Sequence, residues 1–219
     1  MKGMVIIDKL LKNLLRLIFS ISLFLFVIIS SVKITLNFRP LYYFDINYLN
    51  LKKYTSLDNM QIKSTYDYLI NYLNSNKSIN FNIPLLPSSQ EGIIHFFEVK
   101  KLFLKFNFIL AICTLIIIFA IYFAIKYKDY IFLRWCSDII FCTCFILLVG
   151  FFWNFDKCFT FFHKLFFNND YWLLDPKTDP IINILPEVYF LHCAVLILLL
   201  IIGYSILFRL IYQKVKDDK

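Results

Sequence analysis

The residues of this chain best suited to chemistry are its three histidines, His95, His163 and His192. An imidazole exchanges protons near neutral pH, and two imidazoles that converge could supply the base and the acid of one reaction. Each histidine also has a simpler interpretation, as an amphipathic side chain anchored at a membrane interface. That interpretation is favoured for His192, whereas the pattern around His95 leaves both readings open.

Two acidic residues flank His95 at helical spacing. Glu91 lies four residues before it and Glu98 three residues after it, which places all three side chains on adjoining positions of a helix. A carboxylate there could orient the imidazole, or the three residues could form a solvated face. The spacing alone does not decide between these roles.

Familiar catalytic motifs are missing from the sequence. It has no G-x-S-x-G elbow, P-loop, dinucleotide fingerprint or H-E-x-x-H pair. A thiol nucleophile at Cys158 is conceivable, as is a zinc site formed by His95, Glu98 and His163. Both are weakly supported, and the six cysteines include no C-x-x-C pair that would indicate a metal site. If the chain is an enzyme, its nucleophile therefore belongs to the substrate.

The composition indicates a membrane protein. Hydrophobic residues make up 60% of the 219 residues and charged residues only 17%, whereas a soluble domain has about 45–50% and about 25%. Four apolar runs reach the roughly 20 residues that a membrane-spanning helix needs, at 14–36, 107–125, 139–155 and 188–208. We expect an all-α integral membrane protein with a four-helix transmembrane bundle.

The charges predict the orientation of this bundle. The segments 1–13, 126–138 and 209–219 are rich in Lys and Arg, whereas the longer segments 37–106 and 156–187 hold nearly balanced charges. The positive-inside rule therefore places both termini and the connection between the second and third spans in the cytoplasm. The first apolar run is expected to stay as an anchor, since no A-x-A cleavage site follows it.

The net charge of +8 does not predict a nucleic-acid partner. The basic residues flank the apolar runs, which is the pattern found beside anionic lipid headgroups. Membrane lipids are therefore the expected partners of these charges.

The two outward segments are too patterned to be simple linkers. In 37–106, residues 65–73 predict a short amphipathic helix, and Ser88 or Ser89 could cap a second helix that runs through His95. The segment 156–187 is dense in aromatic residues, acids and prolines. We expect the two segments to form a small extracellular domain that caps the bundle.

Two stretches within these segments resemble a known family. The stretch from Glu91 to Lys100 resembles the E-x-x-x-H-x-x-D-V-K signature of bacterial lipoprotein intramolecular transacylases (Lit), with Glu98 standing where aspartate is expected. A second stretch resembles the family's other signature and supplies, in the same order, Phe162-His163, Phe166-Phe167, Trp172, Asp175-Pro176, Asp179 and Pro186-Glu187.

The resemblance implies a reaction and a site. The family moves the sn-2 acyl chain of a diacylglyceryl-modified lipoprotein to the α-amino group of its N-terminal cysteine, giving the lyso-form, at the outer face of the bacterial cytoplasmic membrane. It implies no cofactor and no metal. His95 and His163 correspond to the two family histidines, one as base and the other as acid. Candidates to orient or position the substrate are Glu91, Glu98, Lys100, Trp172, Asp175, Asp179 and Glu187.

Two other functions remain as alternatives. In a non-catalytic membrane assembly or lipid-binding protein, the histidines would only be interfacial anchors. In a zinc-dependent hydrolase, they would hold a metal ion.

Overall fold

The computed structural model describes residues 2–217, with side chains from residue 9 onward. The ends of the two predicted tails, at 1–8 and 218–219, lie outside these described side chains. The described residues form helices and no strand, in the order α1 (Lys2–Asn37), α2 (Arg39–Tyr48), η1 (Leu51–Tyr54), α3 (Asn59–Asn74), α4 (Gln90–Tyr127), α5 (Ile131–Phe166), η2 (Pro180–Ile184) and α6 (Glu187–Asp217). The expected all-α class is confirmed.

Four of these helices are long and apolar enough to cross a membrane. They are α1, α4, α5 and α6, and their qualifying portions contain between 29 and 38 residues. A bilayer core requires about 20, so each helix has residues to spare on one or both sides. The expected four-span, multi-pass membrane architecture is confirmed.

The chain divides into two compact units. The first consists of Met1–Val32, Phe108–Val149 and Ile197–Lys219, and the second of Lys33–Asn107 and Gly150–Leu196. The second unit therefore joins the two segments that the sequence predicts to face outward. The two segments fold together into one compact body, as a small domain formed by both of them requires.

Four helices pack together inside the first unit. The ring of Phe19 on α1 lies 6.2 Å from that of Phe123 on α4 and 6.0 Å from that of Phe132 on α5, measured between centroids. The hydroxyl of Ser137 on α5 donates a 3.0 Å hydrogen bond to the carbonyl oxygen of Ser205 on α6. Small hydroxyl residues commonly join helices in this way where no water is available.

One carboxylate in the first unit contacts two arginines. Asp138 lies 3.7 Å from Arg134, four residues earlier on α5. Its carboxylate also accepts a 2.9 Å hydrogen bond from Arg209 of α6. The pair thus links two helices.

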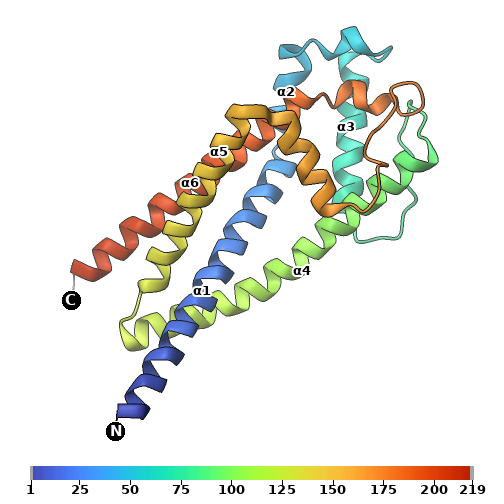
Figure 1. Ribbon diagram of the computed structural model, residues 1–219. Helices are drawn as coiled ribbons and strands as arrows, with labels where there is room; N and C mark the ends of the chain where they lie inside the picture. Colours follow the sequence, from blue (N-terminus) through green and yellow to red (C-terminus); the bar gives the residue numbers. More distant parts are fainter. Residues whose placement is uncertain (1, 218–219) are drawn as a thin grey trace. The chain divides into compact units, whose positions relative to one another are not determined.

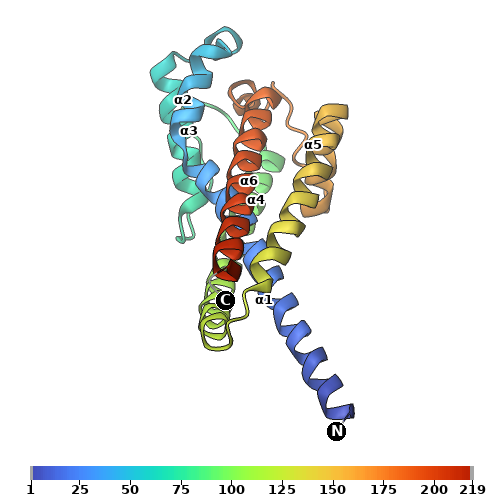
Figure 2. The ribbon, with the colours of Figure 1, turned by 90° about the vertical axis from the view of Figure 1, so that its left-hand side faces the viewer.

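The second unit contains an amphipathic helix longer than residues 65–73. Helix α3 begins at Asn59 because Asp58 forms a capping box: its carboxylate accepts from the Gln61 backbone N–H (2.8 Å), and the Gln61 side chain accepts from the Asp58 N–H (2.9 Å). The buried side of α3 includes Tyr66, Leu69, Ile70 and Leu73. Helices α2 and α3 lie side by side (Figures 1 and 2).

Three tyrosines form the centre of the second unit. Tyr42 of α2 stacks on Tyr66 of α3 with ring centroids 3.7 Å apart. The Tyr66 and Tyr189 hydroxyls lie 2.8 Å apart, and the Tyr42 hydroxyl donates to the Ile184 carbonyl at 2.8 Å. Burial raises the pKa of Tyr42 and of Tyr66 far above the ordinary value, so both stay protonated. The cluster ties α2 and α3 to η2 and to the start of α6.

Helix α5 is kinked at Asn154. Asn154 has extended backbone angles (φ −166°, ψ 102°) inside an otherwise helical run. Its side-chain oxygen accepts from the Lys157 N–H at 2.8 Å, which is the contact made by an N-cap residue. The section after Asn154, which carries His163, therefore starts as a new helical segment with its own direction.

Candidate active site

The structure brings His95 and His163 together in the second unit. His95 lies one turn into α4, and His163 lies near the end of α5. Their ring centroids are 6.1 Å apart. His95 is only 7% exposed and His163 is half-buried. Two imidazoles at this separation can both reach the atoms of one small reacting group.

His163 is held in one orientation by its neighbours. Its Nδ1 lies 2.8 Å from the carbonyl oxygen of Phe159. A carbonyl can only accept, so Nδ1 carries the hydrogen and Nε2 of the neutral ring keeps its lone pair. The Trp172 indole stacks on the same ring at 4.7 Å between centroids. His163 therefore presents Nε2 as a proton acceptor.

His95 is fixed mainly by aromatic packing. Its ring centroid lies 5.0 Å from that of Phe167 and 5.5 Å from that of Phe96. Among the described residues, neither Nδ1 of His95 nor Nε1 of Trp172 has a hydrogen-bond partner, although both atoms are buried. Buried polar atoms normally have partners. These two unpaired atoms, beside His163, are groups that a bound polar substrate could satisfy.

Asp179 lies at the end of the loop that connects α5 to η2 and carries Trp172. It is 2% exposed, and its carboxylate accepts from the backbone N–H of Ser89 and from the hydroxyl of Thr178, both at 2.8 Å. Ser89 in turn caps α4, because its hydroxyl accepts from the Gly92 N–H at 3.0 Å. This agrees with the prediction that Ser88 or Ser89 begins the helix. Asp179 thus connects the loop that carries Trp172 to the helix that carries His95.

Asp179 packs directly against Gly92 of α4. A β-carbon at this position would lie 2.9 Å from Cγ of Asp179 and closer still to Oδ1, so no side chain fits without displacing that carboxylate. We expect Gly92→Ala to lower stability by about 1–3 kcal/mol, as overpacking usually does, and to lower turnover. Thermal unfolding of the purified protein and an activity assay measure both effects.

Gly203 provides the matched control for this substitution. It lies in α6, and a β-carbon there would meet nothing within 4 Å. Gly203→Ala should leave turnover unchanged and stability equal or slightly higher, since alanine favours a helix. Equal effects of the two substitutions would show that the contact between Gly92 and Asp179 does not matter.

The other acidic candidates do not contact the imidazoles. Both carboxylate oxygens of Glu98 accept from the Asn169 side-chain amide, at 3.1 and 3.2 Å. Glu91 and Glu187 are exposed in the first turns of α4 and α6, where a negative charge suits the helix dipole. Asp175 is exposed and accepts from the backbone N–H of Lys177. Asp175 thus holds its local backbone, whereas Glu98 connects α4 to the loop that carries Trp172.

Lys100 is buried against the 75–83 segment and α3. It is 4% exposed, and its ammonium donates to the carbonyl of Lys77 at 2.7 Å while lying 4.5 Å from the centre of the Tyr72 ring. An ammonium so engaged holds the 75–83 segment against α4. These contacts support a structural role for Lys100.

One buried pair was missed by sequence reasoning. Asp45 of α2 is fully buried, and both its carboxylate oxygens lie 2.9 Å from Nδ1 of His192. His192 was expected to be a simple interfacial anchor. Asp45 lies three residues after Tyr42, so the two side chains share one face of a helix. This spacing was the one sequence signal that Asp45 is buried with Tyr42. The pair joins α2 to α6 within the second unit.

The described residues offer no obvious metal site. Within residues 2–217, no group of three or more His, Cys, Asp and Glu side chains is placed to hold a metal ion. Cys158 and Cys193 are both free thiols. The chemistry that these residues can perform is proton transfer by two imidazoles beside an indole.

Comparison with known proteins gives one family. The sequence model of the lipoprotein intramolecular transacylase Lit matches residues 17–190. The structure resembles that of the membrane integral lipoprotein intramolecular transacylase Lit from Bacillus cereus, with 34% sequence identity and a TM-score of 0.91 over 95% of this chain and 97% of that one. No curated protein matches the chain significantly.

Two further solved structures are of variants of the same Bacillus cereus protein. In one a histidine is replaced by arginine, with 32% identity and a TM-score of 0.88 over 99% of this chain and 97% of that one. In the other a histidine is replaced by alanine, with 32% identity and a TM-score of 0.87 over 98% and 97%.

Proposed function

Because the chain belongs to the Lit family of lipoprotein intramolecular transacylases and is therefore an acyltransferase that acts on lipoproteins, we propose that His95 and His163 carry out its proton transfers. The acyl chain moves from the sn-2 oxygen of the diacylglyceryl group to the α-amino group of the N-terminal cysteine. The product is the lyso-form, with an N-acyl group and an S-monoacylglyceryl group.

The observation that carries the proposal is the pairing of the two imidazoles. The attacking amine loses a proton as its nitrogen bonds to the ester carbonyl carbon, and the glycerol oxygen gains one as its bond to that carbon breaks. The histidine pair therefore ends the reaction with the protons it began with. We assign Nε2 of His163 as the acceptor, since Nδ1 is engaged by the Phe159 carbonyl. His95, whose ring centroid lies 6.1 Å from that of His163, would pass the proton taken up by His163 on to the glycerol oxygen, so that both rings end neutral as they began.

The proposed reaction needs no nucleophile from the protein. An α-amine has a pKa of about 7.7–8.0, so its neutral form is accessible near pH 7. Amine and ester belong to one molecule, and orienting such groups can lower a barrier by roughly 7–11 kcal/mol. Exposed apolar side chains on the last section of α5 would contact the substrate's acyl chains: Phe161, Phe162, Leu165 and Phe166.

We also propose the orientation given by the positive-inside rule. Both termini and the α4–α5 connection would lie in the cytoplasm, with spans at 14–36, 107–125, 139–155 and 188–208. The histidine pair would then act at the outer face of the bacterial cytoplasmic membrane. The excess of basic over acidic residues in the first unit, which holds the termini and this connection, supports the assignment: eleven Lys and Arg against five Asp and Glu, compared with twelve against ten in the second unit.

The purified protein and a synthetic diacylglyceryl lipopeptide test the function. Intramolecular transfer leaves the mass of the lipopeptide unchanged, so two other readouts are needed. The α-amine should stop reacting with an amine-labelling reagent, and tandem mass spectrometry should locate one acyl chain on the terminal nitrogen. Release of free fatty acid would indicate a hydrolase, and an unchanged lipopeptide would indicate a non-catalytic lipid-binding protein. Either result from correctly folded protein contradicts the proposal.

A further inference from the structure

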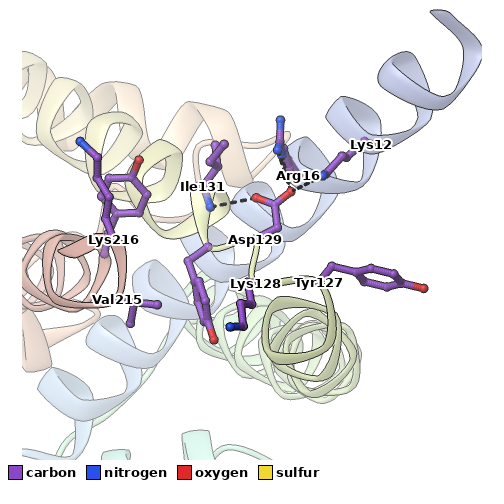
Figure 3. Close-up of a pocket in the computed structure, with 10 residues that line it drawn as sticks. Lys12, Arg16, Tyr127, Lys128, Asp129, Ile131, Val215 and Lys216 are labelled. Atoms are coloured by element: carbon purple, nitrogen blue, oxygen red, sulfur yellow. Dashed lines mark hydrogen bonds and ion pairs between the residues drawn. The ribbon is translucent and has the colours of Figure 1, made fainter. Parts of the chain in front are cut away.

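The first unit contains a pocket that takes no part in the proposed reaction. Its volume is about 240 Å³, and it lies where the N-terminal part of α1, the α4–α5 connection and the end of α6 meet. In Figure 3, Lys12 and Arg16 lie on one side of it and Val215 and Lys216 on the other. Among the described residues, it is also lined by Tyr127, Lys128, Asp129, Tyr130, Ile131 and Tyr212.

The lining of this basic pocket is strongly cationic. Four of its residues are Lys or Arg and one is Asp, so four positive charges and one negative charge leave a formal excess of three. The phenol groups of Tyr127 and Tyr212 add possible hydrogen-bond donors. Ammonium, guanidinium and phenol donors together suit a phosphate group.

Asp129 arranges the basic side chains of α1. Its carboxylate accepts from the Arg16 guanidinium at 2.9 and 2.6 Å and lies 3.4 Å from the Lys12 ammonium. Burial alone would raise the pKa of Asp129, but the hydrogen bonds from Arg16 and from the Ile131 N–H hold it below its ordinary value. The ionised carboxylate therefore fixes two cations at the pocket edge while neutralising only one charge.

An apolar groove of about 360 Å³ adjoins the basic pocket. The two share Lys12, Arg16, Tyr127 and Asp129. The rest of the groove is lined by apolar side chains of α1, α4 and α5: Leu11, Leu15, Phe19, Phe123 and Phe132. A cationic pocket that opens onto an apolar groove matches a molecule with an anionic head and a hydrocarbon tail.

We propose that this site binds one anionic phospholipid, with its phosphate in the basic pocket and an acyl chain in the apolar groove. Basic pockets between membrane helices on the cytoplasmic side are suited to such headgroups. All lining residues belong to the first unit, whereas both histidines belong to the second. The proposal does not depend on the transacylase reaction.

Native mass spectrometry of the full-length protein in detergent tests the site. The probes are phosphatidylglycerol, phosphatidylethanolamine with the same acyl chains, and inorganic phosphate. We expect one molecule of phosphatidylglycerol to bind, about tenfold or more tightly than phosphatidylethanolamine. Inorganic phosphate at the same concentration should not displace it, because phosphate lacks the acyl chain. Complete displacement by phosphate would overturn the assignment to a lipid.

Variants of the basic pocket separate this site from general surface charge. Lys12→Gln with Lys216→Gln removes two cations from the pocket and should weaken binding roughly thirtyfold, at about 1 kcal/mol for each charge. Lys9→Gln with Lys214→Gln removes the same charge from exposed positions outside the lining and should have little effect. Equal weakening by both pairs would contradict the proposal.

Variants of the apolar groove provide a second, independent test. Leu15 lines the groove, whereas its neighbour Leu14 is exposed and does not. Leu15→Trp should fill the groove and reduce phosphatidylglycerol binding at least about tenfold, whereas Leu14→Trp should not. Unfolding temperatures of all variants identify any that are misfolded. Unchanged binding by a folded Leu15→Trp variant would overturn the proposed acyl-chain position.

Discussion

Replacing either His95 or His163 with alanine lowers kcat/KM for transacylation by about 10²–10⁴-fold, the usual contribution of a positioned acid or base. Each substitution removes one of two imidazoles whose centroids lie 6.1 Å apart, so neither ring can replace the other without moving. The conversion of lipopeptide amine, followed over time with equal amounts of folded protein, measures the loss.

His192 provides the control for these substitutions. It is also a histidine of the second unit, but its Nδ1 binds the buried carboxylate of Asp45. His192→Gln removes the imidazole and keeps a side-chain donor, so the folded variant should turn over substrate while unfolding at a lower temperature. Full activity of His95→Ala or of His163→Ala would show that the replaced histidine does not take part in the reaction.

Replacing Asp179 with alanine lowers kcat by about a hundredfold, although Asp179 has no contact with either imidazole among the described side chains. Two donors, the Ser89 N–H and the Thr178 hydroxyl, lose their acceptor, and leaving such groups unpaired costs about 1–3 kcal/mol each. The loop that carries Trp172 then loses one of its two hydrogen-bonded connections to α4, the other being that of Asn169 to Glu98. Misplacement by about 1 Å can cost such a factor in rate.

The conservative variant shows whether Asp179 acts by positioning. Asp179→Asn keeps one acceptor oxygen in the same place and should recover most of the kcat lost in Asp179→Ala, with little change in KM for either variant. A role limited to stability predicts lower unfolding temperatures with normal kcat for the folded fraction. Normal kcat of a folded Asp179→Ala variant would therefore refute positioning.

The membrane architecture could be predicted from the sequence because its signals are local. Each span is a continuous apolar run, and the basic residues between runs indicate orientation without knowledge of any contact. Helix α3 shows the limit of such reasoning: its apolar spacing predicted residues 65–73, but the capping box of Asp58 and Gln61 extends it to Asn59.

The site could be predicted only in part. The motifs that include His95 and His163 pointed to both imidazoles, but their approach depends on the turn of α5 at Asn154, which no local pattern indicated. Glu98 lies one helical turn from His95 in sequence, yet it binds Asn169, 71 residues away. Asp45 was missed for the same reason, because its partner His192 lies 147 residues away.

In the proposed reaction, the substrate's own amine takes the acyl chain from the same molecule. Two lipopeptides test it most directly when mixed in equal amounts with the purified protein: one isotopically heavy in both its peptide and its sn-2 acyl chain, and one light in both. Intramolecular transfer predicts N-acylated products in which heavy chains are found only on heavy peptides and light chains only on light ones. Scrambled products, or heavy chains released as free fatty acid, would contradict it.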